Sequence, residues 1–236
     1  MLTPDSLPAL QQALAAAELD GWLLFDFQGT NPITMGLLGL EGFISRRIFV
    51  WIPRSGVPHA LGHAIEPGPW HAWPQEWGQS TYSSWRSLES SVSRMVKGKR
   101  IAMEYSAGDA VPYLDRVPAG VLEMVRSAGA TSITSSGELV TKFYASWNAS
   151  HIASHVRAAE VIAAIAQAAF LIAGERSRTA MPITEHELML WMQERFAKSG
   201  LSADHGPTVS AGANAANPHY EPSAKSPRPI RDGEVL

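Results

Sequence analysis

The sequence of 236 residues contains no cysteine, which excludes disulfide scaffolds, thiolate metal sites and cysteine nucleophiles. Charged side chains are scarce and make up 17% of the residues. The 19 Lys and Arg against 22 Asp and Glu leave a formal net charge of −3, which argues against a general nucleic-acid binder, because phosphate binding needs clustered basic side chains. Apolar residues reach 45%, so we expect a folded chain with a buried core.

A long hydrophobic run and an early basic segment are also missing. The longest apolar stretch covers residues 161–173 and includes Gln167, whereas a membrane span needs about 20 apolar residues. No Lys or Arg precedes Arg46, so the start of the chain lacks the basic segment of a secretory signal. We therefore expect a soluble, cytoplasmic protein with no membrane partner.

The first part of the chain, residues 1–146, alternates between helix-like and strand-like patterns. Apolar residues spaced by three and four predict helices, and continuous apolar runs indicate strands that are covered on both faces. The predicted elements are helix 7–19, strand 22–25, strand 48–52 turning into a hairpin that ends at residue 65, helix 88–96, strand 100–105 and helix 120–127. Helices that alternate with strands are typical of an α/β layer arrangement.

The second part, residues 147–236, begins with two helical patterns. One apolar stripe over residues 152–172 predicts a long helix that ends at Gly174. Residues 184–187, Thr-Glu-His-Glu, have the spacing of a capping box, in which the hydroxyl and the second carboxylate satisfy free amides at a helix start. We expect the second helix to begin there and to end at Gly200.

Five histidines are candidate metal ligands: His59, His63, His71, His151 and His155. His59 and His63 lie in a predicted strand-turn region, whereas a metal site needs convergent ligands with supporting contacts around them. The last two lie one helical turn apart, but the residues between them lack the Glu that a hydrolytic zinc helix uses as a base. We interpret all five as packing or surface residues.

The segment 67–74 is rich in Trp and Pro and is compatible with a ligand groove. Trp and Pro also stiffen long connections that pack over the edge of a core. We interpret the segment as such a packed loop, and exposed Trp side chains would instead indicate a partner surface.

The stretch 204–222 is the most informative part of the sequence. A short strand is predicted at residues 208–210, followed by a loop of small residues in which His219 follows Pro218. Small residues let a ligand approach backbone amides, and a turn fixed by proline can aim an imidazole. A neutral imidazole can donate or accept a proton near physiological pH. The residues alone leave a functional site and an ordinary loop equally open.

Residues 211–220, Ala-Gly-Ala-Asn-Ala-Ala-Asn-Pro-His-Tyr, resemble the small-Gly-x-Asn-(Gly/Ala)-x-x-Pro-His segment of the pita-bread metallohydrolases. That family includes Xaa-Pro aminopeptidases, prolidases and creatinase. The capping segment 184–187 and the ending 229–236, Pro-x-x-Asp-Gly-Glu-Val-Leu, agree with the family in order and spacing. Residues 19–24 are similar to the opening of its amino-terminal domain, whereas residues 147–152 depart from its usual Lys-Ser-x-x-Glu linker.

The resemblance implies a fold and a set of site residues. The fold would be an α/β amino-terminal creatinase-type domain, a mixed sheet with flanking helices, over residues 1–146, followed by an incomplete α+β pita-bread domain over residues 147–236. In the family the histidine that matches His219 contacts the substrate and assists proton movement. Asn214 and Tyr220 are weaker substrate-binding candidates, which we expect to form the loop and a wall of the site.

The resemblance also implies two divalent metal ions, Mn, Zn or Co, in the full-length parent. The family holds them with two Asp, one His and two Glu, all beyond the strand that starts at residue 233. Asp204, Glu221 and Asp232 match none of these ligands. Because a two-metal site needs its full set of bridging carboxylates, we expect this chain alone to bind no catalytic metal and to hydrolyse nothing.

For the parent protein, the resemblance implies a metallopeptidase that hydrolyses peptide bonds before proline, with a proline-containing peptide as its partner. Two alternatives remain open at this stage: a creatinase-like C–N hydrolase, and a non-catalytic protein-binding module with the same fold. A half-domain with two long helices would expose apolar surface, so we also expect a homo-oligomer.

Overall fold

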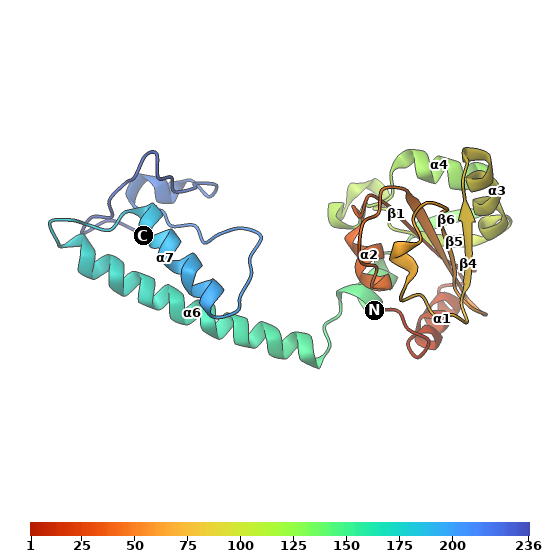
Figure 1. Ribbon diagram of the computed structural model, residues 1–236, viewed down its shortest axis with the longest axis horizontal. Helices are drawn as coiled ribbons and strands as arrows, with labels where there is room; N and C mark the ends of the chain where they lie inside the picture. Colours follow the sequence, from red (N-terminus) through yellow and green to blue (C-terminus); the bar gives the residue numbers. More distant parts are fainter. The chain divides into compact units, whose positions relative to one another are not determined.

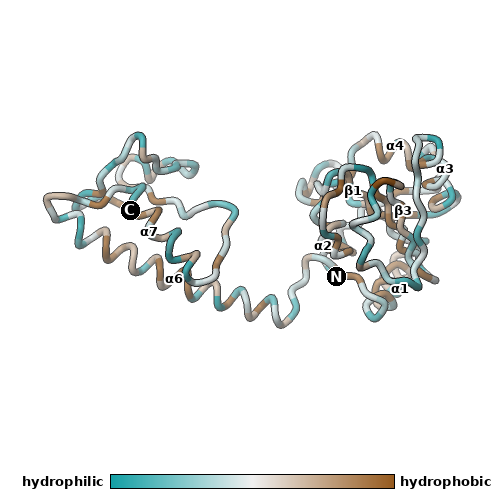
Figure 2. The backbone as a smooth tube through the Cα atoms, viewed as in Figure 1, coloured by the Kyte–Doolittle hydropathy of each residue, from teal (hydrophilic) through white to brown (hydrophobic).

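A computed structural model describes all 236 residues (Figure 1). The chain forms two compact units, Met1–Ser146 and Trp147–Leu236. Figure 2 shows that the most hydrophobic backbone of the first unit lies in its central strands.

The first unit is built on a six-stranded mixed sheet in the order β4-β3-β2-β1-β5-β6. Its strands are β1 Gly21–Phe27, β2 Arg47–Pro53, β3 His59–His63, β4 Gly78–Tyr82, β5 Arg100–Met103 and β6 Ser132–Ser135. β2 pairs antiparallel with both β1 and β3, whereas the remaining neighbours pair in parallel. The predicted hairpin between β2 and β3 and the predicted mixed sheet are confirmed.

Helices cover both faces of this sheet, which explains the continuous apolar runs in its central strands. The helices are α1 Leu7–Ala16, α2 Pro32–Leu38, α3 Trp85–Val96, α4 Ala119–Ser127 and the short α5 Gly137–Val140. Successive residues of a strand point to opposite faces. Accordingly Trp22 and Leu24 pack with α1 and α2 in one core, while Leu23 and Phe25 pack with α3 and α4 in a second core.

The sequence patterns missed α2, β4 and β6. Strand β4 reads Gly-Gln-Ser-Thr-Tyr and β6 reads Ser-Ile-Thr-Ser, so neither carries a strong apolar signal. Both lie at the edges of the sheet, where they are held by backbone pairing with one neighbour. The Trp/Pro segment packs as interpreted: Trp70 and Trp77 belong to the core, and Trp73 lies edge-on between them.

Gly21 at the start of β1 is a position where the packing requires glycine. A Cβ atom built there would lie 2.5 Å from the carbonyl oxygen of Ile52 and would overlap the Trp51 ring. Gly21→Ala is therefore expected to lower the free energy of unfolding of the first unit by about 1–3 kcal/mol, measured by urea denaturation. The matched control is Gly120→Ala in α4, where an added Cβ meets no atom within 4 Å. That variant should gain up to about 1 kcal/mol, and an equal loss in both variants would contradict the packing argument.

The second unit contains two helices, α6 Ala149–Ser177 and α7 Glu185–Lys198, and a 3₁₀ turn at Gly212–Ala216. The prediction that the first helix ends at Gly174 is wrong, because Gly174 keeps helical backbone angles and the helix continues for three more residues. The strand predicted at residues 208–210 does not form either. The segment has no strand beside it to accept its hydrogen bonds, and the one β-bridge of the unit joins Thr184 to Pro229.

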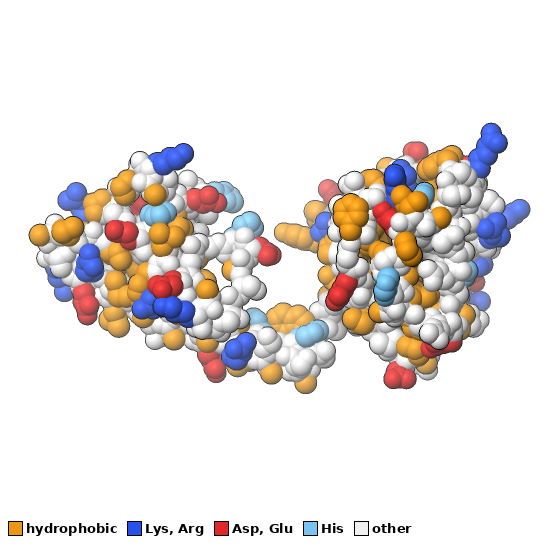
Figure 3. Space-filling model, viewed as in Figure 1, with side chains coloured by type: hydrophobic (Ala, Val, Ile, Leu, Met, Phe, Trp, Pro, Cys, Tyr) orange, Lys and Arg blue, Asp and Glu red, His pale blue; other side chains and the backbone are white.

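Helix α6 has an apolar composition and a largely uncovered surface. Its buried residues are Ile165, Ala169 and Ala173, and the two alanines join Leu188 of α7 in a small core. Hydrophobic side chains also lie along its visible surface (Figure 3). Five hydrophobic side chains of α6 are between 47% and 69% exposed: Ile152, Val156, Ile162, Phe170 and Leu171. The expected exposed apolar surface is thus present, and the homo-oligomer remains a prediction.

By length and composition alone, α6 is the one helix that could cross a membrane, and 17% of its most apolar window is buried. A single such helix is weak evidence, because core helices of soluble domains have the same composition.

Candidate functional site

The start of helix α7 carries a buried carboxylate. Thr184 caps the helix: its hydroxyl accepts a hydrogen bond from the Glu187 amide at 3.2 Å, and the Glu187 carboxylate accepts one from the Thr184 amide at 2.8 Å. The predicted capping box is therefore confirmed. The hydrogen bond from the Thr184 amide lowers the pKa of Glu187. Glu185, the first helical residue, turns inward and is 1% exposed.

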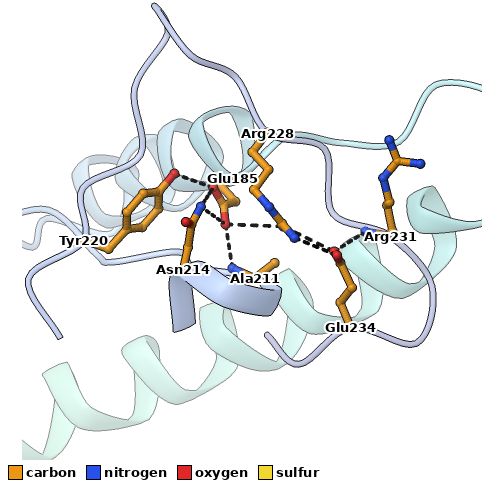
Figure 4. A network of polar contacts seen from close by, with 7 residues as sticks. All are labelled: Glu185, Ala211, Asn214, Tyr220, Arg228, Arg231 and Glu234. Atoms are coloured by element: carbon orange, nitrogen blue, oxygen red, sulfur yellow. Dashed lines mark hydrogen bonds and ion pairs between the residues drawn. The ribbon is translucent and has the colours of Figure 1, made fainter. Parts of the chain in front are cut away.

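Four groups converge on the Glu185 carboxylate (Figure 4). The Ala211 amide donates at 2.6 Å, the Asn214 side-chain nitrogen at 3.0 and 3.2 Å, and the Tyr220 hydroxyl at 2.5 Å. The Arg228 guanidinium lies 3.6 Å away and supplies the opposite charge. Because the phenol donates to a carboxylate, the pKa of Tyr220 is raised. A buried charge surrounded in this way is stabilised by the donors and by the amino end of the helix.

Arg228 extends this network to the last residues of the chain. Its guanidinium donates to the Glu234 carboxylate at 2.6 and 3.3 Å, and the Arg231 amide donates to the same carboxylate at 3.0 Å (Figure 4). These contacts, with that from Arg228 the larger, lower the pKa of Glu234. The amide of Gly212 also donates to the Val235 carbonyl at 2.8 Å. The loop 211–220 is thereby joined to the segment 228–235.

The structure separates the three predicted site residues by the direction they face. Asn214 and Tyr220 donate hydrogen bonds to the buried Glu185, whereas His219 on the same loop is exposed. His219 and Tyr220 both line a cavity of about 540 Å³. The other lining residues are Met189, Gln193, Asp204, His205, Gly206, Pro207, Thr208, Pro218, Glu221 and Pro222. The imidazole is thus accessible to a ligand and lies among polar groups.

Sequence reasoning missed Glu185, Arg228 and Glu234. The capping box explains Thr184 and Glu187 but gives no role to Glu185, which lies between them in the motif. That unexplained carboxylate was the one sequence signal that pointed to Glu185. Arg228 and Glu234 lie in a Pro-rich stretch where an ordinary exposed charge is the default expectation. Both carboxylate oxygens of Glu185 accept hydrogen bonds from the loop, so the carboxylate is suited to hold the loop together. The accessible imidazole of His219 is the group suited to exchange a proton with a ligand.

No group of three or more His, Asp or Glu side chains in the structure is arranged to hold a metal ion. The residues present therefore do not fit a metal centre by themselves. Two of the five histidines make other contacts: the His59 ring bonds to the Ser80 hydroxyl at 2.8 Å, and His63 packs edge-on against Tyr82.

Comparison with solved structures identifies the fold as that of the prolidases and related dipeptidases. A dipeptidase (PepE) from Mycobacterium ulcerans matches with a TM-score of 0.71 and 17% identity, covering 98% of this chain and 57% of its own. A Xaa-Pro dipeptidase from Bacillus anthracis matches at 0.63 and 15%, covering 98% and 58%. A prolidase from Thermococcus sibiricus matches at 0.59 and 17%, covering 99% and 60%. The chain thus spans between 57% and 60% of the length of these proteins.

Residues 153–236 match the model of metallopeptidase family M24. This region includes α7, the loop 211–220 and the whole Glu185 network. The predicted relationship to the pita-bread metallohydrolases is confirmed for this part of the chain, and the fold of creatinase-type domain followed by part of a pita-bread domain is confirmed by the solved structures. No characterised protein sequence matches the chain closely enough to count as a relative.

Proposed function

We propose that this chain is the amino-terminal part of a metal-dependent peptidase that hydrolyses the peptide bond before proline. The observation that carries the proposal is the position of His219, an accessible imidazole on a Pro-His-Tyr loop within the region that matches family M24. The similar structures include a prolidase and a Xaa-Pro dipeptidase, which supports proline-containing peptides as the substrate class.

The role proposed for His219 follows from its chemistry. An imidazole beside the scissile bond can donate a hydrogen bond to the carbonyl oxygen, where charge develops, or relay a proton to the leaving nitrogen by accepting one proton on one ring nitrogen and giving one up from the other. Tyr220 forms part of the wall of the same cavity, while its hydroxyl is engaged by Glu185. In the proposed enzyme, metal ions would supply the activated water. The residues of this chain offer no ligand set for them, so we propose that the chain alone is inactive.

The test compares this chain with a longer protein that includes the sequence downstream of residue 236 in its coding region. With added Mn²⁺, the longer protein is expected to cleave Xaa-Pro dipeptides or the amino-terminal residue of Xaa-Pro peptides, and the 236-residue chain is expected to cleave neither. His219→Ala in the longer protein should lower kcat by about 100-fold or more, because it removes a proton-transfer group. His71→Ala, an exposed histidine of the first unit, is the matched control and should leave kcat unchanged.

Other outcomes would overturn parts of the proposal. Hydrolysis of creatine with no action on Xaa-Pro peptides would indicate a creatinase-like C–N hydrolase. A longer protein that binds no metal and cleaves nothing would indicate a protein-binding module. Stoichiometric metal in the 236-residue chain, together with cleavage of Gly-Pro, would refute its proposed inactivity.

A further inference from the structure

Apart from the hydrogen bond of the Gly212 amide to the Val235 carbonyl, the loop that carries His219 is held in place mainly by Glu185. Between Gly212 and Tyr220, most side chains are small or exposed. The backbone hydrogen bonds donated by Asn214, Asn217 and Tyr220 each reach only three residues back along the chain. His219 itself donates its amide to the Asn217 side chain, which is another local contact. Local bonds of this kind shape a loop but do not fix its position on the protein.

The side chains that reach inward from this loop are those of Asn214 and Tyr220, and both end on the same carboxylate. One contact lies before His219 and the other directly after it, so they brace the Pro218-His219 turn from both sides. The Ala211 amide at the start of the loop completes the set. A single buried charge therefore meets the loop at three points along its length.

We propose that Glu185 is the positioning residue for the His219 imidazole: its buried carboxylate holds the loop 211–220 at both ends and thereby sets where the ring stands. This inference rests on the proposed function, because the position of the ring matters for catalysis only if His219 contacts the substrate. The hydrogen-bonding pattern requires a charged acceptor, because one carboxylate serves several donors at once and lies beside the Arg228 guanidinium.

The segment 228–235 provides the other half of this arrangement. Arg228 lies between Glu185 and Glu234 and contacts both. The Gly212 backbone, with a φ of +55°, passes so close to this arginine that an added Cβ would lie 2.6 Å from its guanidinium. The ion pairs of Arg228 with Glu185 and Glu234 thus connect the loop to the segment 228–235.

The experiment measures the order of the loop in the 236-residue chain without any ligand. Hydrogen–deuterium exchange followed by mass spectrometry reports the amides of residues 211–220, and the Hε1 resonance of His219 reports its surroundings by NMR. Glu185→Gln is expected to speed exchange of these amides by about tenfold or more and to move the His219 resonance, because charge-assisted bonds are replaced by neutral ones. The ultraviolet titration of the Tyr220 phenol should also shift to lower pH, since its carboxylate partner is gone.

The matched control is Glu187→Gln on the same helix turn. It weakens the capping box but touches no residue of the loop, so exchange should rise at the start of α7 and stay unchanged at residues 211–220. Tyr220→Phe is the second variant. It removes the hydrogen bond from the Tyr220 hydroxyl to Glu185 and leaves Glu185 and Arg228 paired. This variant therefore keeps the test valid if Glu185→Gln does not fold.

Two results would overturn the inference. One is unchanged exchange and an unmoved His219 resonance in the Tyr220→Phe or Glu185→Gln chain. The other is an equal effect of Glu187→Gln, which would make the loop sensitive to helix capping in general. Neither readout requires a substrate, so a failure here is distinct from a failure to find Xaa-Pro hydrolysis.

Discussion

Replacing Glu104 with glutamine is expected to remove most of the pH dependence of the stability of the first unit between pH 5 and pH 8. Glu104 lies directly after β5 and is fully buried. Its carboxylate accepts hydrogen bonds from the Trp22 indole nitrogen, from the Asn31 side chain at 3.2 Å and from the Ser136 hydroxyl at 3.4 Å. No cation is paired with it.

The pKa of Glu104 determines the direction of the effect. Burial raises it from 4.5 to about 7, and the hydrogen bonds from Trp22 and Asn31 oppose this rise only in part. In the unfolded chain the carboxyl loses its proton near pH 4.5, while in the folded chain it keeps the proton until about pH 7. The stabilising contribution is therefore complete below about pH 4.5 and is lost as the pH rises through 7. It amounts to about 3 kcal/mol, since one pKa unit corresponds to about 1.4 kcal/mol.

Urea denaturation at pH 5, 6, 7 and 8, followed by tryptophan fluorescence, measures this change. The glutamine amide also alters one of the hydrogen bonds, which changes the unfolding free energy at every pH. The readout is therefore the slope of the unfolding free energy against pH. His59, whose pKa is lowered mainly by burial, adds an opposite dependence that is present in both proteins and cancels in the comparison. Glu89→Gln at an exposed position of α3 is the control, and a slope that stays the same in Glu104→Gln would contradict the argument.

The second large effect is expected for Arg228→Met. This change leaves the buried Glu185 without its opposite charge and also removes the partner of Glu234. Breaking a buried ion pair from one side typically costs more than 3 kcal/mol, although Arg228 is partly exposed and Glu185 keeps three hydrogen-bond donors. We therefore expect the second unit to lose about 3 kcal/mol of stability.

Hydrogen exchange of α7 and of residues 228–236 in the whole chain measures this loss. The control is Arg178→Met, which breaks an ion pair with Asp232 of nearly the same length, 3.4 Å, but with both side chains more than half exposed. That variant should change stability by less than about 1 kcal/mol, because solvent screens exposed pairs. Equal effects of the two variants would mean that the burial of Glu185 does not matter.

The sequence already located the elements that local chemistry specifies. The apolar runs at 22–25 and 48–52 predicted the two central strands, because a strand covered on both faces has no polar alternation. The spacing of Thr184 and Glu187 predicted the helix start, because a capping box involves only residues within one turn. The small residues around Pro218 and His219 pointed to the loop and to its family.

Only the tertiary structure decided which residues support that loop. Glu185 is an ordinary acidic residue at a helix start when read along the chain, and Arg228 is one of several basic residues near the end. Their partnership depends on a loop and a terminal segment folding onto the same helix, which no local pattern encodes. The edge strands β4 and β6 likewise could not be predicted from the sequence, because each is defined by its pairing with a neighbouring strand. Local periodicity records which side a residue faces, whereas contacts between distant segments exist only once burial has brought those segments together.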